Sequence, residues 1–323
     1  MITIKPITVA EISDRFATSR GGGTLPNSSW RGDARYLLPV TQPVPLRELL
    51  CVFNGYTPDA KVSLFPERLQ KVDPAGWSIH ALAPTTVRNL WVASSERTRL
   101  KIEQGHQFAS SSCLHELERS FQDLKADLPT AETRGVLIAA VQQDPSVQRL
   151  PHLETEAYLP NLQLSLKGAA QRCPLFEFQL EKKATALTGI YQQALCDWLS
   201  ETMGLDFVRE NGREPLVVGV PESLGFSETQ ADKRPKTLAT LLRSNESLKF
   251  EDWQGQAARQ GWGKADADAL VALASRRVSI LSAFENPGGE KHERSRSESA
   301  TTGDSSEKKA NAQSQKATMS MSF

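Results

Sequence analysis

The spacing of apolar residues changes along the chain and predicts different secondary structure in different parts. The first third contains short apolar runs separated by proline and glycine, a pattern typical of strands. We expect strands at residues 36–40, 50–53, 61–65, 77–82, 89–93 and 99–103, with the last two forming a hairpin. A β-rich domain is therefore predicted for residues 1–110.

Helical spacing appears after this part. Apolar residues recur at steps of three and four from Leu114 to Leu128, which predicts an amphipathic helix that ends at Pro129. A second helix is expected from Thr130 to Pro145. Further along, an apolar stripe that includes Leu187 and Leu199 predicts another helix, and Gly204 follows it as a terminating glycine.

Between these helices, apolar and polar residues alternate with a period of two. Residues 153–159, 162–166 and 176–180 are therefore predicted to be strands, and the apolar run within residues 214–222 predicts a short buried strand. The order over residues 130–222 becomes helix, strand, strand, strand, helix, strand. We expect residues 111–222 to form a central α/β unit.

The last part divides into helices and a polar tail. Helical patterns over residues 236–285 predict a helical module at residues 223–287. Residues 288–323 contain few large apolar side chains and are expected to be a disordered tail. The predicted fold class is thus α+β, with a β-rich N-terminal domain, a central α/β unit, a helical C-terminal module and the tail.

Composition narrows the class of protein. The 323 residues have no net charge, and the mean hydropathy is −0.40. No apolar run approaches the ~20 residues that a membrane helix requires, and the start of the sequence does not resemble a secretory signal. The four cysteines lack the short spacings of a disulfide framework. We expect a cytoplasmic protein that does not enter a membrane.

Charge and aromatic residues point to a polyanion as a partner. Residues 1–110 contain 13 Lys and Arg against 9 Asp and Glu, whereas residues 111–220 contain 10 against 15. Residues 15–36, called here the Arg/aromatic segment, combine cations and aromatic rings as single-stranded nucleic-acid sites do. The predicted contacts are Arg15, Arg20, Trp30, Arg31 and Arg35. The alternative is a mobile loop that leads into the first strand.

One stretch points to phosphodiester chemistry. Residues 160–183, PNLQLSLKGAAQRCPLFEFQLEKK, resemble the signature hairpin of the PD-(D/E)xK nuclease-like superfamily, and the element order over residues 130–222 agrees with its core. The resemblance implies a Mg²⁺ ion held by carboxylates and a lysine that steadies the attacking hydroxide. Asn161 and Gln179 depart from this motif, because they stand where an Asp and the Lys belong.

A shift of four residues restores part of the motif. Glu177, Glu181 and Lys183 then become the candidate catalytic residues, with Glu132, Glu154 or Glu156 as sources of the missing carboxylate. Three interpretations stay open: an ordinary hairpin in a sheet, a nuclease-like fold that no longer cuts, and an active nuclease.

Two other patterns argue against a zinc site and against a helix that reads DNA bases. His106, Cys113 and His115 lack the spacing of a zinc site. The helical pair near the C-terminus could read DNA, but Asp266 and Asp268 at the start of its second helix would repel phosphates. We therefore interpret this pair as a packing or protein-docking module.

Taken together, these features give one leading hypothesis and two alternatives. The leading hypothesis is a non-catalytic nucleic-acid-associated protein, a component of a larger complex, with protein partners and no cofactor. The first alternative is a Mg²⁺-dependent nuclease of the PD-(D/E)xK type. The second is a structural or adaptor protein in a protein assembly.

Overall fold

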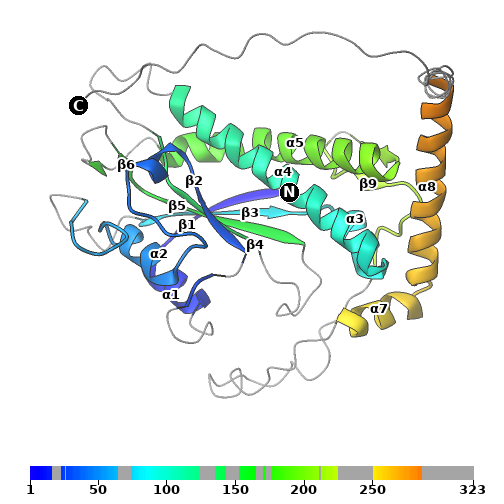
Figure 1. Cartoon of the computed structure of the whole chain (residues 1–323), viewed down its shortest axis with the longest axis horizontal. Helices are drawn as coiled ribbons and strands as arrows, with labels where there is room; N and C mark the ends of the chain where they lie inside the picture. Colours follow the sequence, from blue (N-terminus) through cyan, green and yellow to red (C-terminus); the bar gives the residue numbers. More distant parts are fainter. Residues whose placement is uncertain are drawn as a thin grey trace, which may run out of the picture. The chain divides into compact units, whose positions relative to one another are not determined.

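The computed structural model describes residues 1–16, 23–25, 27–64, 74–123, 135–142, 153–164, 170–171, 176–210, 212–224 and 250–285. Its centre is a five-stranded antiparallel sheet with the strand order β1-β3-β5-β4-β2 (Figure 1). The strands are β1 (Ile2–Ile7), β2 (Ser28–Arg31), β3 (Gly76–Leu82), β4 (Ile138–Gln142) and β5 (Glu154–Pro160).

Helices cover both faces of this sheet. The long helices α4 (Glu96–Asp123) and α5 (Phe176–Met203) pack against each other on one face, together with α3 (Thr85–Ala93). On the other face lie α1 (Val9–Phe16) and α2 (Leu46–Phe53), and the short helix η1 (Asp33–Tyr36) follows β2 (Figure 1). The sheet is therefore the middle layer of three.

The remaining described elements are short strand pairs and two C-terminal helices. The pairs are β6 (Gln163–Leu164) with β7 (Ala170–Gln171), and β8 (Phe207–Val208) with β9 (Leu216–Val217). The helices are α7 (Phe250–Arg259), which packs on α3, and α8 (Lys264–Glu285). None of the described helices is both long and apolar enough to span a membrane.

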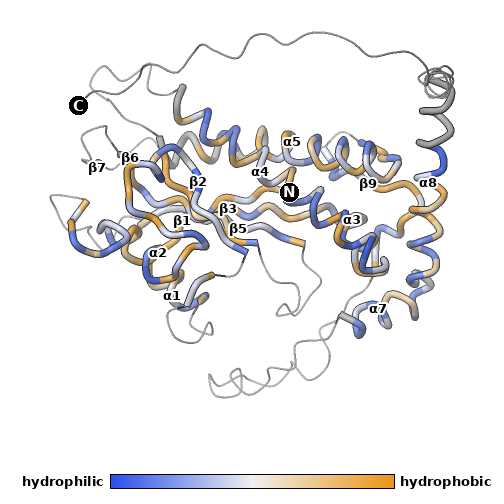
Figure 2. Tube along the Cα trace, in the orientation of Figure 1, coloured by the Kyte–Doolittle hydropathy of each residue, from blue (hydrophilic) through white to orange (hydrophobic). Residues whose placement is uncertain are grey.

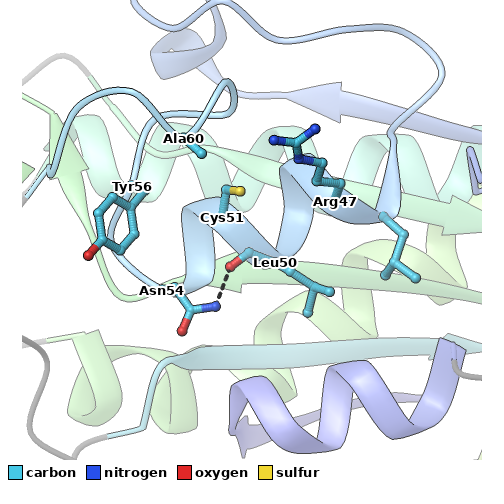
Figure 3. Close-up of a pocket in the computed structure, with 7 residues that line it drawn as sticks. Arg47, Leu50, Cys51, Asn54, Tyr56 and Ala60 are labelled. Atoms are coloured by element: carbon cyan, nitrogen blue, oxygen red, sulfur yellow. Dashed lines mark hydrogen bonds between the residues drawn. The ribbon is translucent and has the colours of Figure 1, made fainter. Parts of the chain in front are cut away.

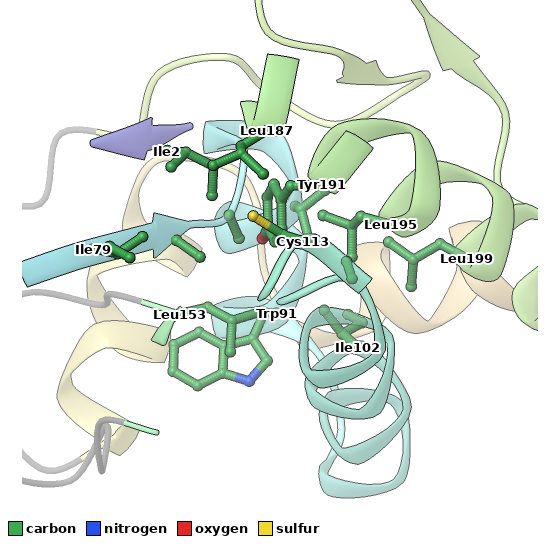
Figure 4. Packing of buried hydrophobic residues seen from close by; sticks show 14 of the residues in the cluster. Ile2, Ile79, Trp91, Ile102, Cys113, Leu153, Leu187, Tyr191, Leu195 and Leu199 are labelled. Atoms are coloured by element: carbon green, nitrogen blue, oxygen red, sulfur yellow. The ribbon is translucent and has the colours of Figure 1, made fainter. Parts of the chain in front are cut away.

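Alternation along the strands separates two hydrophobic cores. On β3, Trp77 and Ile79 join the core beneath α4 and α5, to which Tyr191 and Leu195 of α5 also belong (Figure 4). The neighbouring strand β5 places Tyr158 in the second core, beneath α1 and α2. Hydrophobic stretches follow the strands of the sheet in Figure 2, as a layer buried on both sides requires. Successive side chains point to opposite faces, so the register decides which polar residues meet.

The predicted α+β class is confirmed, but several predicted elements are wrong. Residues 50–53, 89–93 and 99–103 lie in α2, α3 and α4 and form no strands. Short apolar runs fit either type of element, and the buried residues Leu46, Leu49 and Phe53 on α2 follow helical spacing. Residues 36–40 and 61–64 form no ladder strand either. The predicted strands at residues 77–82 and 153–159 are confirmed as β3 and β5.

The central unit shows the opposite error as well. The helix predicted from Thr130 to Pro145 is wrong where it is described, because residues 138–142 form β4, an interior strand of the sheet. The strand predicted at residues 176–180 is wrong because these residues belong to α5. The helix predicted around Leu187 and Leu199 is confirmed, and Gly204 follows it with a φ of 71°.

The predicted domain limits can be compared with the positions of the helices and strands. Residues 110 and 111 lie within α4, and the sheet takes strands from both sides of that point. Two of the three helices predicted near the C-terminus correspond to α7 and α8. The first of them, from residue 236, and the predicted disordered tail lie outside the described residues.

Candidate functional site

Four ionisable side chains gather on the sheet face that carries α1. Arg15 comes from the last turn of α1, His80 from β3, and Glu154 and Glu156 from β5. These four residues are called here the charged cluster. The strand register pairs His80 directly with Glu156, and the period of two places Glu154 on the same face.

The histidine links the two carboxylates. Its Nδ1 lies 2.6 Å from Oε1 of Glu154, and its Nε2 lies 3.2 Å from Oε1 of Glu156. The guanidinium of Arg15 forms an ion pair with the same Glu156 carboxylate. Both ring nitrogens of His80 therefore face a carboxylate, and Arg15 supplies a full positive charge beside Glu156.

Burial differs strongly within the cluster. The Glu156 side chain is 1% exposed, whereas the Arg15 side chain is 41% exposed. A buried carboxylate is stable only when cations and hydrogen-bond donors surround it. The outer part of the cluster is thus the Arg15 guanidinium, and a negatively charged ligand that approaches this face meets that cation.

A tyrosine hydroxyl lies beside the cluster but is not available for chemistry. Arg15 Nη1 donates to the hydroxyl of Tyr158 at 3.5 Å, and the Tyr158 side chain is completely buried. Burial raises the pKa of Tyr158 well above its usual value, and the nearby Arg15 opposes that rise. At neutral pH this phenol keeps its proton and is a weak nucleophile.

A second polar group lies on the opposite face, in the core beneath α4 and α5. His106 is fully buried, and its Nδ1 lies 2.7 Å from the hydroxyl of Tyr191, while Thr155 Oγ1 lies 3.0 Å from Nε2. Burial lowers the pKa of His106 to about 3, so the ring is neutral at physiological pH. A neutral imidazole with both nitrogens engaged joins α4, β5 and α5 as a structural link.

A surface hollow is lined by α2 and the loop after it. Its volume is about 600 Å³, and it is bordered by Leu46, Arg47, Leu50, Cys51, Asn54, Tyr56 and Ala60 (Figure 3). Asn54 Nδ2 donates one of its two hydrogens to the carbonyl oxygen of Leu50. This hollow is mostly apolar and contains no pair of acid and base groups.

The three predicted catalytic residues do not form a strand site. Glu177, Glu181 and Lys183 all lie on α5, so the alternation that was to bring them to one face is absent. The run of three alternating apolar residues was too short to separate a strand from the first turns of a long helix. The catalytic role of these residues stays a prediction.

The Arg/aromatic segment is only partly placed as predicted. Trp30 is completely buried in the second core and has no face open to a base. Arg31 donates to Ser111 of α4 at 2.9 Å, and Arg35 lies 4.6 Å above the ring of Tyr36. Arg15 belongs to the charged cluster, and Arg20 lies outside the described residues. These nucleic-acid contacts stay predictions, except that Trp30 cannot stack on a base in this structure.

Sequence reasoning missed His80 and the pairing of the cluster. The alternation of Glu154 and Glu156 on a strand was a usable signal, since it places two carboxylates on one face. Within the described ranges, no group of three His, Cys, Asp or Glu residues is arranged to hold a metal ion. Within the charged cluster, the Glu156 carboxylate is paired with Arg15.

Solved structures of one protein resemble this fold at low sequence identity. A metal-free complex of the conjugative relaxase TrwC with OriT DNA has a TM-score of 0.56 at 16% identity, covering 81% of this chain and 99% of that one. A metal-bound complex gives 0.55 at 15% identity, with 87% and 99% covered. A complex with a 27-mer DNA that comprises the recognition hairpin and the cleavage site gives 0.54 at 16%, with the same coverage. These likenesses show the fold.

No protein in the curated set matches the chain. The family comparison is decisive, because the model of the TrwC relaxase family matches residues 19–231, more than half of the chain. The resemblance to the PD-(D/E)xK superfamily is therefore wrong, and so is the nuclease of that type. Relaxases are DNA-processing enzymes, so the interpretation as a non-catalytic protein is wrong as well. The chain belongs to the TrwC relaxase family.

Proposed function

We propose that this chain binds a DNA strand that carries a recognition hairpin next to a cleavage site, and processes that strand as a relaxase. The family match over residues 19–231 carries this proposal. The DNA in the structures of TrwC supports it, because those complexes hold OriT DNA and, in one case, a strand with both features. The fold that resembles theirs includes 81–87% of this chain.

The charged cluster is the proposed contact with the strand near the cleavage site. A DNA backbone is an array of phosphates, and the most exposed group of the cluster is the Arg15 guanidinium. Arginine binds phosphate through a planar fork of donors and stays charged at every physiological pH. Lys5 on β1 adds an exposed cation to the same face. Thr3 pairs directly with His80 and therefore shares its face, and Lys5 lies two residues further along the strand, on that face too.

Breaking the strand requires a hydroxyl that attacks phosphorus and a leaving oxygen that gains a proton. Tyr158 is beside Arg15 but is buried, and burial raises its pKa well above the usual value, so it does not supply the attacking group in this conformation. Arg15 supplies positive charge for the phosphate oxygens as negative charge develops on them. The described residues thus account for phosphate binding more completely than for the attack.

A labelled oligonucleotide with a hairpin and a single-stranded extension tests both parts of the proposal. We expect binding in fluorescence anisotropy that weakens as salt rises, because cations on the protein displace counterions from phosphates. Arg15→Glu should weaken binding at least tenfold, whereas Arg119→Glu, a change at an exposed pair on α4, should leave it within twofold. A denaturing gel of the same samples measures cleavage. Absence of salt-dependent binding would overturn the proposal.

A further inference from the structure

Solved structures of TrwC include a metal-bound form, a copper-bound form and a metal-free form. We propose that in this chain the guanidinium of Arg15 takes the place of a metal ion at the charged cluster, so that the wild-type protein holds no divalent cation there. The inference concerns a property of the folded protein alone and does not depend on DNA binding.

The positive charge already present is the first argument. Arg15 supplies a full positive charge beside the Glu156 carboxylate, and both ring nitrogens of His80 face the two glutamates. A divalent cation that entered this cluster would face the arginine at short range. In a site where Glu156 is 1% exposed, little water is present to screen that repulsion.

The geometry of the possible ligands is the second argument. A histidine binds a metal ion through a nitrogen that carries no proton and is free to face the ion. Both ring nitrogens of His80 instead face carboxylate oxygens, at 2.6 and 3.2 Å. Hard cations such as Mg²⁺ take several oxygen ligands, and the oxygen of Glu156 closest to His80 is also the one that pairs with Arg15. No group of three ligands is therefore free within the cluster.

With arginine in place of a metal ion, the charge that attracts a phosphate to this face belongs to the protein itself. A bound metal can be removed by a chelator, whereas a guanidinium is part of the chain and has a fixed charge. Contact of this face with an anion should therefore not depend on free divalent cations. Arg15 is a charged partner of the buried Glu156, so loss of Arg15 removes an ion pair from that carboxylate.

The test measures binding of Mn²⁺ alone, without DNA, by isothermal titration and by the shift in thermal unfolding. Wild type is expected to show neither stoichiometric heat nor a shift. Arg15→Ala should gain one Mn²⁺ site, and the gain should disappear in the double variant Arg15→Ala with Glu156→Gln. Arg119→Ala, which removes an exposed arginine from an ion pair on α4, should behave as wild type. Arg15→Lys keeps a cation and should also bind no Mn²⁺.

Two results would overturn the inference. One is stoichiometric Mn²⁺ binding by wild type that Glu156→Gln abolishes. The other is a folded Arg15→Ala protein that gains no Mn²⁺ site. If Arg15→Ala is unfolded without metal, the same titration is followed by circular dichroism: refolding with millimolar Mn²⁺ is the expected gain, and failure to refold counts against the inference. Failure of DNA binding would leave these results unchanged, so the two proposals are tested separately.

Discussion

The guanidinium of Arg15 and the carboxylate of Glu156 form an ion pair between α1 and the central strand β5, and the carboxylate is 1% exposed. The two residues are far apart in sequence, so the pair fixes the position of α1 on the sheet. Loss of the arginine would remove a charged partner from this buried carboxylate, which also lies 3.2 Å from Nε2 of His80.

Removal of the Arg15 side chain should therefore lower the stability of the protein. We expect Arg15→Leu to reduce the free energy of unfolding by about 1–3 kcal/mol, since it leaves a buried carboxylate short of a partner. Urea denaturation measures the change. Arg119→Leu, at the exposed pair with Glu116, should change the stability by less than about 0.5 kcal/mol. Equal losses of unfolding free energy in the two variants would show that the buried Arg15 pair stabilises the protein no more than an exposed pair does.

The buried histidine should make stability depend on pH. The pKa of His106 is lowered to about 3 in the folded protein, below the ordinary value of ~6.5 for the unfolded chain. Between these values the unfolded chain binds a proton that the folded protein does not, so stability falls as pH falls below about 6.5. The slope due to His106 reaches about 1.4 kcal/mol per pH unit.

His106→Asn should remove that part of the slope, although it also loses hydrogen bonds and is less stable at pH 7. Urea denaturation of wild type and variant at pH 7 and pH 5 gives the comparison. The expected result is a smaller difference between the two proteins at pH 5 than at pH 7. A constant difference would mean that the histidine accepts a proton in the folded state.

Two glycines on the packed helices α4 and α5 should respond in opposite ways to alanine. A Cβ at Gly105 would lie 2.6 Å from Cε3 of Trp198, so Gly105→Ala forces the helices apart and should cost about 1–3 kcal/mol. A Cβ at Gly189 meets nothing within 4 Å, and Gly189→Ala should gain about 0.5–1 kcal/mol from helix propensity. Thermal and urea unfolding check both, and effects of the same sign would contradict the packing.

Trp30 offers a direct check on the nucleic-acid contacts expected from the sequence. Its ring is buried in the second core, so Trp30→Ala should cost about 3–5 kcal/mol of stability. The milder variant Trp30→Phe should stay folded and bind the hairpin oligonucleotide as wild type does. A large loss of affinity in folded Trp30→Phe would instead indicate that the ring stacks on a base.

The parts of the fold that sequence predicted well are those with long or strict periodicity. The helix of Leu187 and Leu199 has several turns of regular spacing, and Trp77, Ile79 and Ala81 alternate over a whole strand. The residues of strand β4 are apolar on both faces, as an interior strand requires, and therefore show no alternation that would distinguish them from a helix. Short helices such as α2 show the opposite case, because their brief apolar runs predict a strand.

The candidate site could be predicted only in part, because it depends on strand register. Glu154 and Glu156 alternate within one strand, and this is visible in the sequence. Their contact with His80 requires that β3 pair with β5, and the contact with Arg15 requires that α1 cross the same face. Nothing in the local sequence around His80 fixes either relation, so the sequence alone does not indicate a role for this residue.

The position of bound DNA tests the central claim most directly. A photo-crosslinking amino acid would replace exposed Lys5, on the face of the charged cluster, and in a second protein would replace Leu273 on α8, which is 63% exposed. With the hairpin oligonucleotide present, irradiation should attach DNA at position 5 and not at position 273. Attachment at position 273 alone, or at neither position under conditions where anisotropy shows binding, would contradict the assignment of this face to the DNA strand.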